Sequence, residues 1–551
     1  MRVHENVQLE EIRRVYGKIS PFELKNKLIN LAEGPKKKSI NTLLNAGRGN
    51  PNWTASLPRE AFFTFGQFAV LETKRVWEDK DLAGMPSRPG IAERLNDYLT
   101  KNTTLPGIEL IKKIVEYGSD KGFNADKWVF ELADGIIGDN YPVPDRMLLH
   151  IEKVVQDYLI KEIGYDSTSE DNFNIFAVEG ATAAMCYIFD SLIANKLLKI
   201  GDSVAIMTPV FTPYLEIPHL ERYNFSITEI KASNYESGIN MWQYDKSEIE
   251  KLCNKDIKAL FVINPSNPPS VSIKPETINE LVKIVHEHNP DLMIISDDVY
   301  CTFVEKFRSL AAYLPFNTIG VYSFSKYFGV TGWRLGTIAI HKNNVFDKLL
   351  KNQSAEDKNE LNKRYEALST NPEKICFIDR IVADSRQVAL NHTAGLSTPQ
   401  QVQMAFFCIF ALTDKENNYK KLTQNICHHR EELLYKGLHM ELKHNPYDAA
   451  YYTEFDLLQW AGETFNKDFA DYLQKNHKPV DILLRLAEES SIVLLNGGGF
   501  HAPEWSIRIS LANLKDESYL KIGEYLHKIL EDYVLSWENE KNKIVRKSSL
   551  L

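Results

Sequence analysis

The feature that most restricts the fold of this chain is an alternation of apolar runs and helical stretches between residues 173 and 341. The apolar runs are rich in β-branched and aromatic residues, as strands are, and they read FNIFAVEG, DSVAIMTP, KALFVINP, DLMIISDDVY, IGVYSF and TIAI. Between them lie ATAAMCYIFDSLIANKLL and PETINELVKIVHEHN, which have the pattern of helices. Strands separated by helices predict a mostly parallel α/β sheet that is covered on both faces.

The chain is too long for one small domain, because 551 residues correspond to several domains of average size. We expect residues 1–53 to form an N-terminal arm that completes part of a small domain. Residues 54–400 are predicted to form the large domain, with helical insertions near 70–140 and 341–390. A C-terminal small domain of the α+β type is expected over residues 401–551.

Composition limits the classes of function. The formal net charge of −9 argues against nucleic acid as a partner, because phosphate binding needs a basic face. The six cysteines have no CxxC spacing, which favours reduced thiols over a disulfide framework or a metal site. The N-terminus lacks an apolar signal core, and the most hydrophobic run, AFFCIFAL, is far too short to span a membrane. We therefore expect a soluble, cytoplasmic protein.

One lysine stands out in the stretch SFSKYFGVTGWRLG, which runs from Ser323 to Gly336. Most lysines are solvated surface residues, but Lys326 lies between two strand-like apolar runs. Partial desolvation lowers the pKa of a lysine, and a neutral amine can form a Schiff base with a carbonyl compound or with pyridoxal phosphate. The stretch therefore raises the possibility of a nucleophilic lysine.

A second segment, AVEGATAAM, predicts a strand that turns into a helix at Gly180, Ala181 and Thr182. The free backbone N–H groups and the positive end of a helix favour a phosphate group at such a position. A glycine before a helix is more often just a turn, so this segment is a weak signal when taken alone.

Two further segments end predicted strands with polar side chains. In IISDDVY, Asp297 is a carboxylate at the end of a buried strand, where a protonated pyridine nitrogen could be its cationic partner. A helix N-cap or a salt bridge is the alternative. In NPSNPPS, two Asn-Pro pairs predict a rigid loop that aims the amide of Asn267, for example at a phenolic oxygen. A plain turn is the alternative there.

These four segments, in this order and spacing, resemble the fold-type I family of pyridoxal-phosphate enzymes, the aspartate aminotransferase superfamily, over about residues 140 to 515. The resemblance implies a large domain with a mostly parallel seven-stranded sheet flanked by helices, a smaller α+β domain, pyridoxal 5'-phosphate as cofactor and at least a homodimer. The cofactor-binding residues that it implies are Tyr141, Gly180, Ala181, Thr182, Phe211, Asn267, Asp297, Tyr300, Ser323, Lys326 and Arg334.

The same resemblance implies roles for individual residues. Lys326, Asp297 and Tyr300 are expected to be catalytic, and Asn267 is expected to contact both the cofactor and the substrate. Arg508, in WSIRISL, matches the arginine that grips the substrate α-carboxylate in a bidentate way.

The length of the chain, the variant NPSNPPS and the loop NAGRGNPNW look like the aspartate β-decarboxylase group within this family. That group converts L-aspartate to L-alanine and carbon dioxide, has a side aspartate:2-oxoglutarate aminotransferase activity and assembles from dimers into larger homo-oligomers. Arg48 in NAGRGNPNW is then expected to bind the second substrate carboxylate. An aspartate or aromatic aminotransferase without decarboxylase activity is the alternative, and a non-enzymatic module that binds pyridoxal phosphate is a more distant one.

Overall fold

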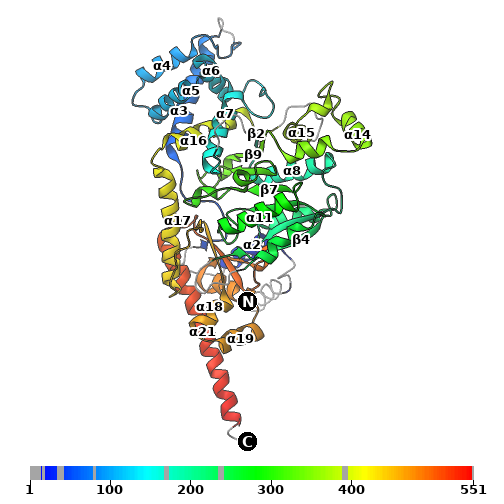
Figure 1. Ribbon diagram of the computed structural model, residues 1–551. Coiled ribbons are helices and arrows are strands. Elements are labelled where there is room, and N and C mark those ends of the chain that lie inside the picture. The colour runs from blue at the N-terminus through cyan, green and yellow to red at the C-terminus, as the bar shows by residue number, and fades with distance from the viewer. Residues whose placement is uncertain are drawn as a thin grey trace.

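The computed structural model describes residues 14, 19–33, 43–77, 82–166, 173–233, 241–386 and 395–548, with side chains up to residue 542. The molecule has a large lobe around a central sheet and a smaller lobe that carries the C-terminal helix (Figure 1). Within the part of the chain that the structure describes, none of the helices combines the length and the apolar composition needed to cross a membrane.

The central sheet has the strand order β2-β9-β8-β7-β6-β3-β4-β5. Neighbouring strands from β4 to β8 are parallel, whereas β9 runs antiparallel to both β2 and β8, and β5 antiparallel to β4. This confirms the predicted mostly parallel α/β sheet; the two-residue β5 adds an eighth strand at one edge. The strands are β2 (Phe173–Val178), β3 (Ser203–Thr208), β4 (Ser226–Ser233), β5 (Gln243–Tyr244), β6 (Ile257–Ile263), β7 (Met293–Asp297), β8 (Thr318–Ser323) and β9 (Gly336–His341).

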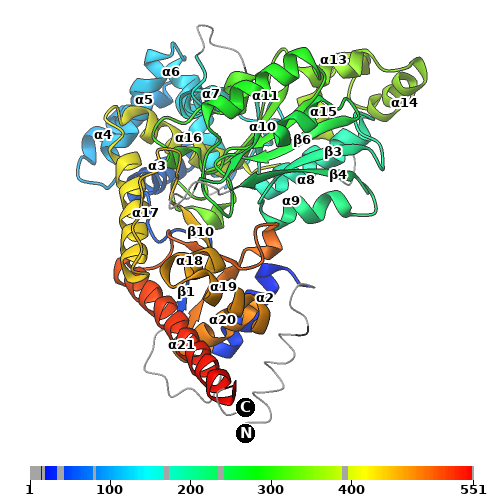
Figure 2. The same ribbon diagram turned by 60° about the horizontal axis from the view of Figure 1, so that its bottom comes forward.

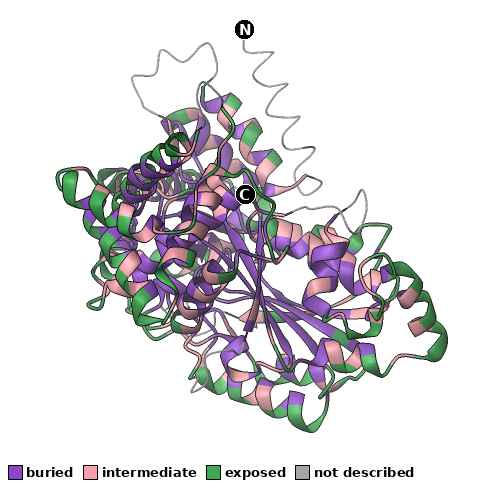
Figure 3. Cartoon of the chain, turned by 90° about the horizontal axis from the view of Figure 1, so that it is seen from above, coloured by how far each residue is buried: buried purple, intermediate pink, exposed green. Residues whose placement is uncertain are grey.

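Helices surround this sheet, and its strands are mostly buried between them, except for β4 and β5 at one edge, which are partly exposed (Figure 3). The apolar faces of the helices follow the periodicity expected from the sequence, so that in α11, for example, the buried residues are Ile278, Leu281, Ile284 and Val285. The helices of this part of the large lobe are α7 (Leu149–Glu162), α8 (Ala181–Ala194), α9 (Thr212–Glu216), α10 (Lys246–Ile249), α11 (Pro275–Glu287), α12 (Leu310–Tyr313), α13 (Val345–Lys351), α14 (Ala355–Tyr365) and α15 (Phe377–Asp384), of which α14 lies at the outer edge, away from the strands (Figure 1).

A separate group of helices packs on the large lobe at the top of Figure 1. In this group, α16 contacts α3, α5, α6 and α7, so one long helix joins the early helices to the body of the lobe. The group comprises α3 (Ser56–Arg75), α4 (Ile91–Lys101), α5 (Ile108–Asp120), α6 (Ala125–Ile137) and α16 (Thr398–Thr413).

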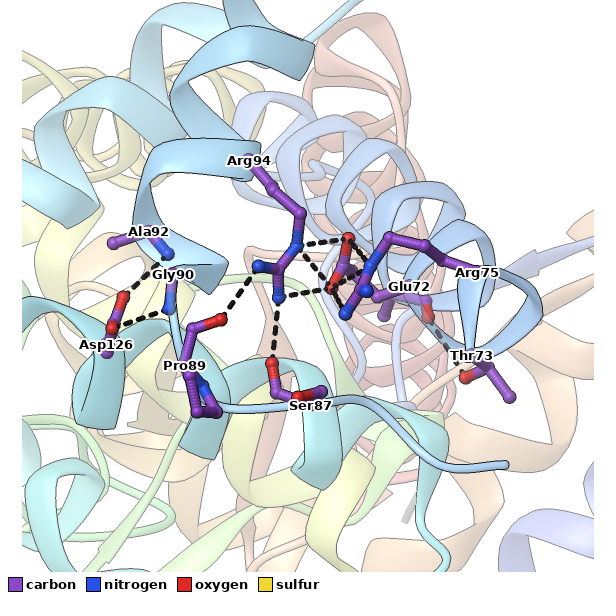
Figure 4. A network of polar contacts seen from close by, with 10 residues as sticks. Glu72, Thr73, Arg75, Ser87, Pro89, Gly90, Ala92, Arg94 and Asp126 are labelled. Carbon is purple, nitrogen blue, oxygen red and sulfur yellow. Dashed lines mark hydrogen bonds and ion pairs between the residues drawn. The ribbon is translucent and has the colours of Figure 1, made fainter. Parts of the chain in front are cut away.

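An ion network centred on the buried Glu72 joins the end of α3 to α4 (Figure 4). Arg94 and Arg75 both pair with the carboxylate of Glu72, at 2.8 and 3.1 Å. Burial by itself raises the pKa of Glu72, but the hydrogen bonds from the two guanidinium groups outweigh burial and lower it. Asp126 accepts hydrogen bonds from the backbone N–H groups of Gly90 and Ala92, at 2.8 and 3.1 Å, and so fixes the start of α4.

The smaller lobe combines segments from both ends of the chain. Its three-stranded sheet has the order β10-β13-β12 and is antiparallel, and β1 pairs in parallel with β11. Its helix α17 descends from the large lobe and packs along α21 (Figures 1 and 2). The elements are α2 (Pro21–Ala32), β1 (Leu44–Asn45), α17 (Asn418–Gly437), β10 (Tyr452–Asp456), α18 (Leu457–Thr464), α19 (Lys467–Asn476), α20 (Pro479–Arg485), β11 (Ile492–Val493), β12 (Leu495–Asn496), β13 (Ser506–Ser510) and α21 (Asp516–Ser548).

Candidate active site

A cavity of about 240 Å³ lies where the carboxyl ends of β2, β3, β6, β7 and β8 face the smaller lobe. Ligands bind at this edge in open α/β sheets. The cavity brings together residues from both lobes. The predicted site residues that line it are Ala181, Thr182, Phe211, Asn267, Asp297, Tyr300, Ser323, Lys326, Arg334 and Arg508.

One end of the cavity is suited to a phosphate group. Gly180 precedes α8 with φ of 89°, and no side chain caps the helix, so its first N–H groups are free of a capping partner. Arg334 donates to the carbonyl oxygen of Glu179 at 3.1 Å, and among the described residues no carboxylate pairs with it. A Cβ on Gly180 would lie 2.5 Å from a terminal nitrogen of Arg334, which would have to shift, and the φ of 89° itself favours glycine here.

The hydroxyl groups at this end come from the turn after β8. Ser323 Oγ donates to Ser325 Oγ at 3.0 Å, and both side chains are buried and line the cavity. N–H groups without a capping side chain, hydroxyl groups and a guanidinium without a described carboxylate partner form a donor set that matches a phosphate dianion.

Asp297 supplies a buried carboxylate at the end of β7. It accepts a hydrogen bond from Tyr214 Oη at 2.5 Å and one from the N–H of Val299 at 3.1 Å. Burial raises the pKa of Asp297 to about 6, although these hydrogen bonds and the charge of Lys326 act to lower it. A protonated ring nitrogen beside this carboxylate would compensate the cost of its burial, so the group fits a pyridinium.

The neighbouring Asp298 does not line the cavity. Its carboxylate accepts from Ser296 Oγ at 2.7 Å and from Ser309 Oγ at 2.5 Å, on the other side of the strand. Burial raises the pKa of Asp298 to about 7. Of the two aspartates in IISDDVY, Asp297 is therefore the one that can meet a ligand.

Lys326 lies half-buried between β8 and β9, and its Nζ donates to the carbonyl oxygen of Gly49 at 3.0 Å. The carbonyl groups that follow it are held by side chains from other elements. Trp53 Nε1 donates to the oxygen of Tyr327 at 3.0 Å, and Arg59 donates to the oxygen of Gly329 at 2.7 Å. The loop that carries the lysine is therefore held in place by side chains from other segments of the chain.

Arg508 forms the opposite wall and is 1% exposed. It donates to Asn267 Oδ1 at 3.0 Å and to the carbonyl oxygen of Gly47 at 3.1 Å, and Nε has no hydrogen-bond partner among the described residues. Its guanidinium lies 4.3 Å from the ring centroid of Tyr452 and 5.1 Å from that of Phe500. No described carboxylate pairs with this buried cation, so its charge is suited to an anionic ligand.

Asn267 and Tyr300 connect the two walls. Asn267 Nδ2 donates to Tyr300 Oη at 3.4 Å, while its Oδ1 accepts from Arg508. Tyr300 Oη also lies 3.1 Å from Tyr452 Oη. The side chains of Asn267, Tyr300 and Arg508 thus form one connected polar network, whereas their predicted contact with a phenolic oxygen of the cofactor stays a prediction.

Three predicted residues are not among those that line the cavity, namely Gly180, which immediately precedes α8, and Arg48 and Tyr141. Arg48 is exposed on the loop between Gly47 and Gly49, and Tyr141 is 79% exposed. Their roles stay predictions. The charge of Arg48 nevertheless affects Lys25. The pKa of Lys25 is lowered, first by burial and then by the charges of Arg48 and Arg508.

Sequence reasoning missed several residues of the site. Tyr214 follows Phe211 by three residues in TPVFTPY, so helical spacing could have revealed it. Ser325 was visible in the quoted lysine segment. Tyr452 gave no local signal, because its position depends on contacts between distant parts of the chain.

The comparisons agree with this geometry. The model of the family described as aminotransferase class I and II matches residues 168–526. A bifunctional aspartate aminotransferase and L-aspartate beta-decarboxylase from Pseudomonas sp. is 44% identical over 522 residues, which cover 94% of this chain and 97% of the relative. An aspartate aminotransferase from Pyrococcus abyssi is 26% identical over 254 residues, which cover 45% of this chain and 58% of that protein.

Solved structures share the fold. A double mutant of Thermus thermophilus aspartate aminotransferase superimposes with a TM-score of 0.57 at 17% identity, covering 92% of this chain and 96% of that chain. An aromatic aminotransferase from Pyrococcus horikoshii gives a TM-score of 0.56 at 18% identity, covering 90% and 97% of the two chains.

Proposed function

Because the chain belongs to the class I and II aminotransferase family, we propose that it is a pyridoxal-phosphate enzyme that converts L-aspartate to L-alanine and carbon dioxide, with aspartate:2-oxoglutarate aminotransferase as a side activity. The observation that carries this proposal is the 44% identity to the bifunctional Pseudomonas relative over 94% of the chain. That match extends well beyond residues 168–526, which the general family model covers.

The residues of the cavity fit the cofactor. The start of α8, Ser323 and Arg334 would hold its phosphate, Phe211 would stack on its ring and Asp297 would pair with its ring nitrogen. Asn267 and Tyr300 would bind its phenolic oxygen. Bound pyridoxal phosphate supplies an electron sink, which takes up the electron pair released when a bond at the substrate α- or β-carbon breaks.

Arg508 orients the substrate. Its buried guanidinium, held by Asn267 and Gly47, would bind the α-carboxylate of aspartate. The second carboxylate would meet Arg48 and Lys25, which lie close enough to each other and to Arg508 for the two arginine charges to lower the pKa of Lys25. Two carboxylates facing separate cations give the site its preference for a dicarboxylic amino acid.

Lys326 moves the protons. Its Nζ would take the proton from the substrate α-carbon and return it later, as a general base and then a general acid. In the decarboxylation, the bond between Cβ and its carboxylate breaks, carbon dioxide leaves and a proton takes its place on Cβ. Arg508 holds the α-carboxylate in an orientation in which the bond between Cα and this carboxylate cannot break. Orientation therefore decides which carboxylate is lost.

The side activity uses the same residues. Lys326 again moves the α-proton, but the carbon skeleton leaves as oxaloacetate before carbon dioxide is lost, and a 2-oxo acid such as 2-oxoglutarate takes up the amino group. The two reactions therefore compete for aspartate at one site.

Assembly is part of the proposal. A homodimer at least, and a larger homo-oligomer built from dimers, would place the exposed Tyr141 of one subunit near the phosphate of its neighbour. Light scattering of the purified protein should give at least twice the mass of 63.2 kDa, and a monomer would contradict this part of the proposal.

Product analysis tests the activity. The holoenzyme is incubated with L-aspartate and a trace of pyruvate, and alanine, oxaloacetate and carbon dioxide are measured over time. Equal amounts of alanine and carbon dioxide, far above the pyruvate supplied, are expected. Oxaloacetate matched one to one by alanine, without enzyme-dependent carbon dioxide, would instead identify a plain aminotransferase.

A further inference from the structure

Ser270 combines full burial with a backbone conformation that its side chain disfavours. The residue closes the loop NPSNPPS with φ of 67°, in the left-handed region where glycine is the favoured residue. A serine that accepts this strain must be held there by its contacts. Its hydroxyl group is the only feature that distinguishes it from alanine, so the contacts of that group identify its use.

The hydroxyl group reaches across from the large lobe to the smaller one. Ser270 Oγ accepts hydrogen bonds from the backbone N–H groups of Tyr451 and Tyr452, at 3.1 and 3.3 Å. Its carbonyl oxygen accepts from the N–H of Ala449 at 2.8 Å, and its own N–H donates to the carbonyl oxygen of Ser266 at 2.9 Å. Ser270 thus ties the loop that carries Asn267 to the first residues of β10.

Tyr452 carries this connection into the cavity. Its hydroxyl group lies 3.1 Å from that of Tyr300, and its ring lies 4.3 Å from the guanidinium of Arg508. It is itself one of the residues that line the cavity. β10 also pairs directly with β13, where Glu454 is opposite Arg508. The backbone position of Tyr452 therefore affects both the cofactor-facing Tyr300 and the substrate-facing Arg508.

We propose that Ser270 is a positioning residue, whose hydroxyl group holds Tyr452 against Arg508 and thereby sets the affinity of the site for a dicarboxylate. The inference rests on the proposed function, because it assumes that Arg508 binds a substrate carboxylate. A small displacement of the ring leaves the guanidinium less well oriented, and orientation of a bidentate clamp strongly affects binding.

Two substitutions separate this role from folding. Ser270→Gly removes the hydroxyl group but relieves the backbone strain, whereas Ser270→Ala removes the hydroxyl group and keeps the strain. The two variants should therefore differ in melting temperature, with the alanine variant lower. They should lose affinity for succinate, an unreactive dicarboxylate, to the same extent, by about tenfold. A loss of affinity that follows the melting temperature would overturn the proposal.

Ser272 provides a matched control. It is also buried, and its Oγ donates across the same lobe boundary to the carbonyl oxygen of Tyr447 at 3.2 Å, away from Tyr452. Ser272→Ala should leave the affinity for succinate within twofold of that of the wild type. An equal loss in both serine variants would mean that any contact across the boundary matters, which contradicts a specific role for Ser270.

A double-mutant cycle tests whether the effect passes through Tyr452. Succinate binding to the holoenzyme is measured by titration calorimetry for the wild type, Ser270→Gly, Tyr452→Leu and the double variant. The tenfold loss caused by Ser270→Gly should shrink to less than twofold in the Tyr452→Leu background. Independent, additive losses would overturn the proposal, and so would a wild type that does not bind succinate.

The result of the succinate-binding experiments can be distinguished from the result of the test for the proposed activity. Succinate binding requires neither proton transfer nor loss of carbon dioxide. A wild type that binds succinate but forms no alanine would contradict the decarboxylase activity alone, whereas unchanged affinity in Ser270→Gly would contradict the role of Ser270 alone.

Discussion

The cavity has a cofactor wall, which includes Asp297 and Arg334, and a substrate wall, which includes Arg508. Different kinds of contact hold these two walls in place. On the cofactor side, the key groups are fixed by contacts within the large lobe, as Tyr214 fixes Asp297 and the carbonyl oxygen of Glu179 fixes Arg334. On the substrate side, Arg508 belongs to the smaller lobe and is fixed by Asn267 of the large lobe as well as by Gly47. The cofactor wall is therefore part of the rigid sheet edge, whereas the substrate wall exists only while the lobes are correctly joined.

This difference separates chemistry from specificity. Changes in the cofactor wall should affect the reaction with every substrate, because all substrates use the same proton-moving and cofactor-binding groups. Changes in the substrate wall should mainly affect which acid binds and how tightly. The predictions below are ordered by their expected effect on product formation.

The largest loss of product formation is expected when Lys326 is replaced, because Lys326 lies where the cofactor wall and the substrate wall meet. Lys326→Ala removes the proton-moving amine, and product formation should fall by about 10³-fold or more. Alanine and oxaloacetate are measured with equal amounts of folded protein. If only one of the two products disappeared, the claim that both arise at one site would be wrong.

Arg508→Lys is expected to have the next largest effect. Lysine keeps the charge but loses the bidentate geometry, so KM for aspartate should rise by roughly 10- to 100-fold, with a smaller change in kcat. Steady-state kinetics provide the measurement. A kcat effect without a KM effect would contradict the assignment of Arg508 to the substrate wall.

A smaller, pH-dependent effect is expected for Tyr214→Phe. The hydrogen bond from Tyr214 lowers the pKa of Asp297, so its loss should raise that pKa above about 6. Asp297 would then become protonated at a higher pH, and cofactor affinity should begin to fall at a higher pH on acidification than in the wild type. Tyr223→Phe is the control, because Tyr223 donates to Asp190 outside the cavity. Identical pH profiles in all three proteins would contradict the role of Tyr214.

Arg59→Met should affect stability more than catalysis. Arg59 donates to the carbonyl oxygens of Ala55, Phe328 and Gly329, and their loss of a charged partner should lower the free energy of unfolding by about 2 to 3 kcal/mol. Activity at low temperature should stay within a few-fold of that of the wild type.

Denaturant unfolding measures this difference. The exposed Arg222 serves as the control, since Arg222→Met should change stability by about 0.5 kcal/mol or less. Equal losses in the two variants would show that Arg59 does not support the lysine loop.

The same contrast explains what could be predicted from the sequence. The sheet and the cofactor wall are encoded in short segments, in which Gly180, Asp297 and Lys326 each lie at the end of a recognisable strand or shortly after it. The substrate wall gave fewer signals. The contacts of Tyr452 with Arg508 and of Ser270 with β10 join residues that lie far apart in sequence, and no periodicity records them.

The prediction for Arg48 shows how little a sequence motif in a loop reveals about which atoms of the loop make contacts. The segment NAGRGNPNW correctly drew attention to this part of the site, because Gly47 and Gly49 contact Arg508 and Lys326 through their backbone oxygens. These contacts use carbonyl groups that every residue has. The sequence could therefore point to the arginine side chain but not to the backbone that makes the observed hydrogen bonds.

The most direct test of the central claim uses L-aspartate labelled with ¹³C at one carboxylate at a time. If Arg508 retains the α-carboxylate while the β-carboxylate leaves, label at carbon 4 should appear in carbon dioxide, and label at carbon 1 should remain in alanine. Release of the carbon 1 label as carbon dioxide, with the carbon 4 label retained in the amino acid product, would contradict the account.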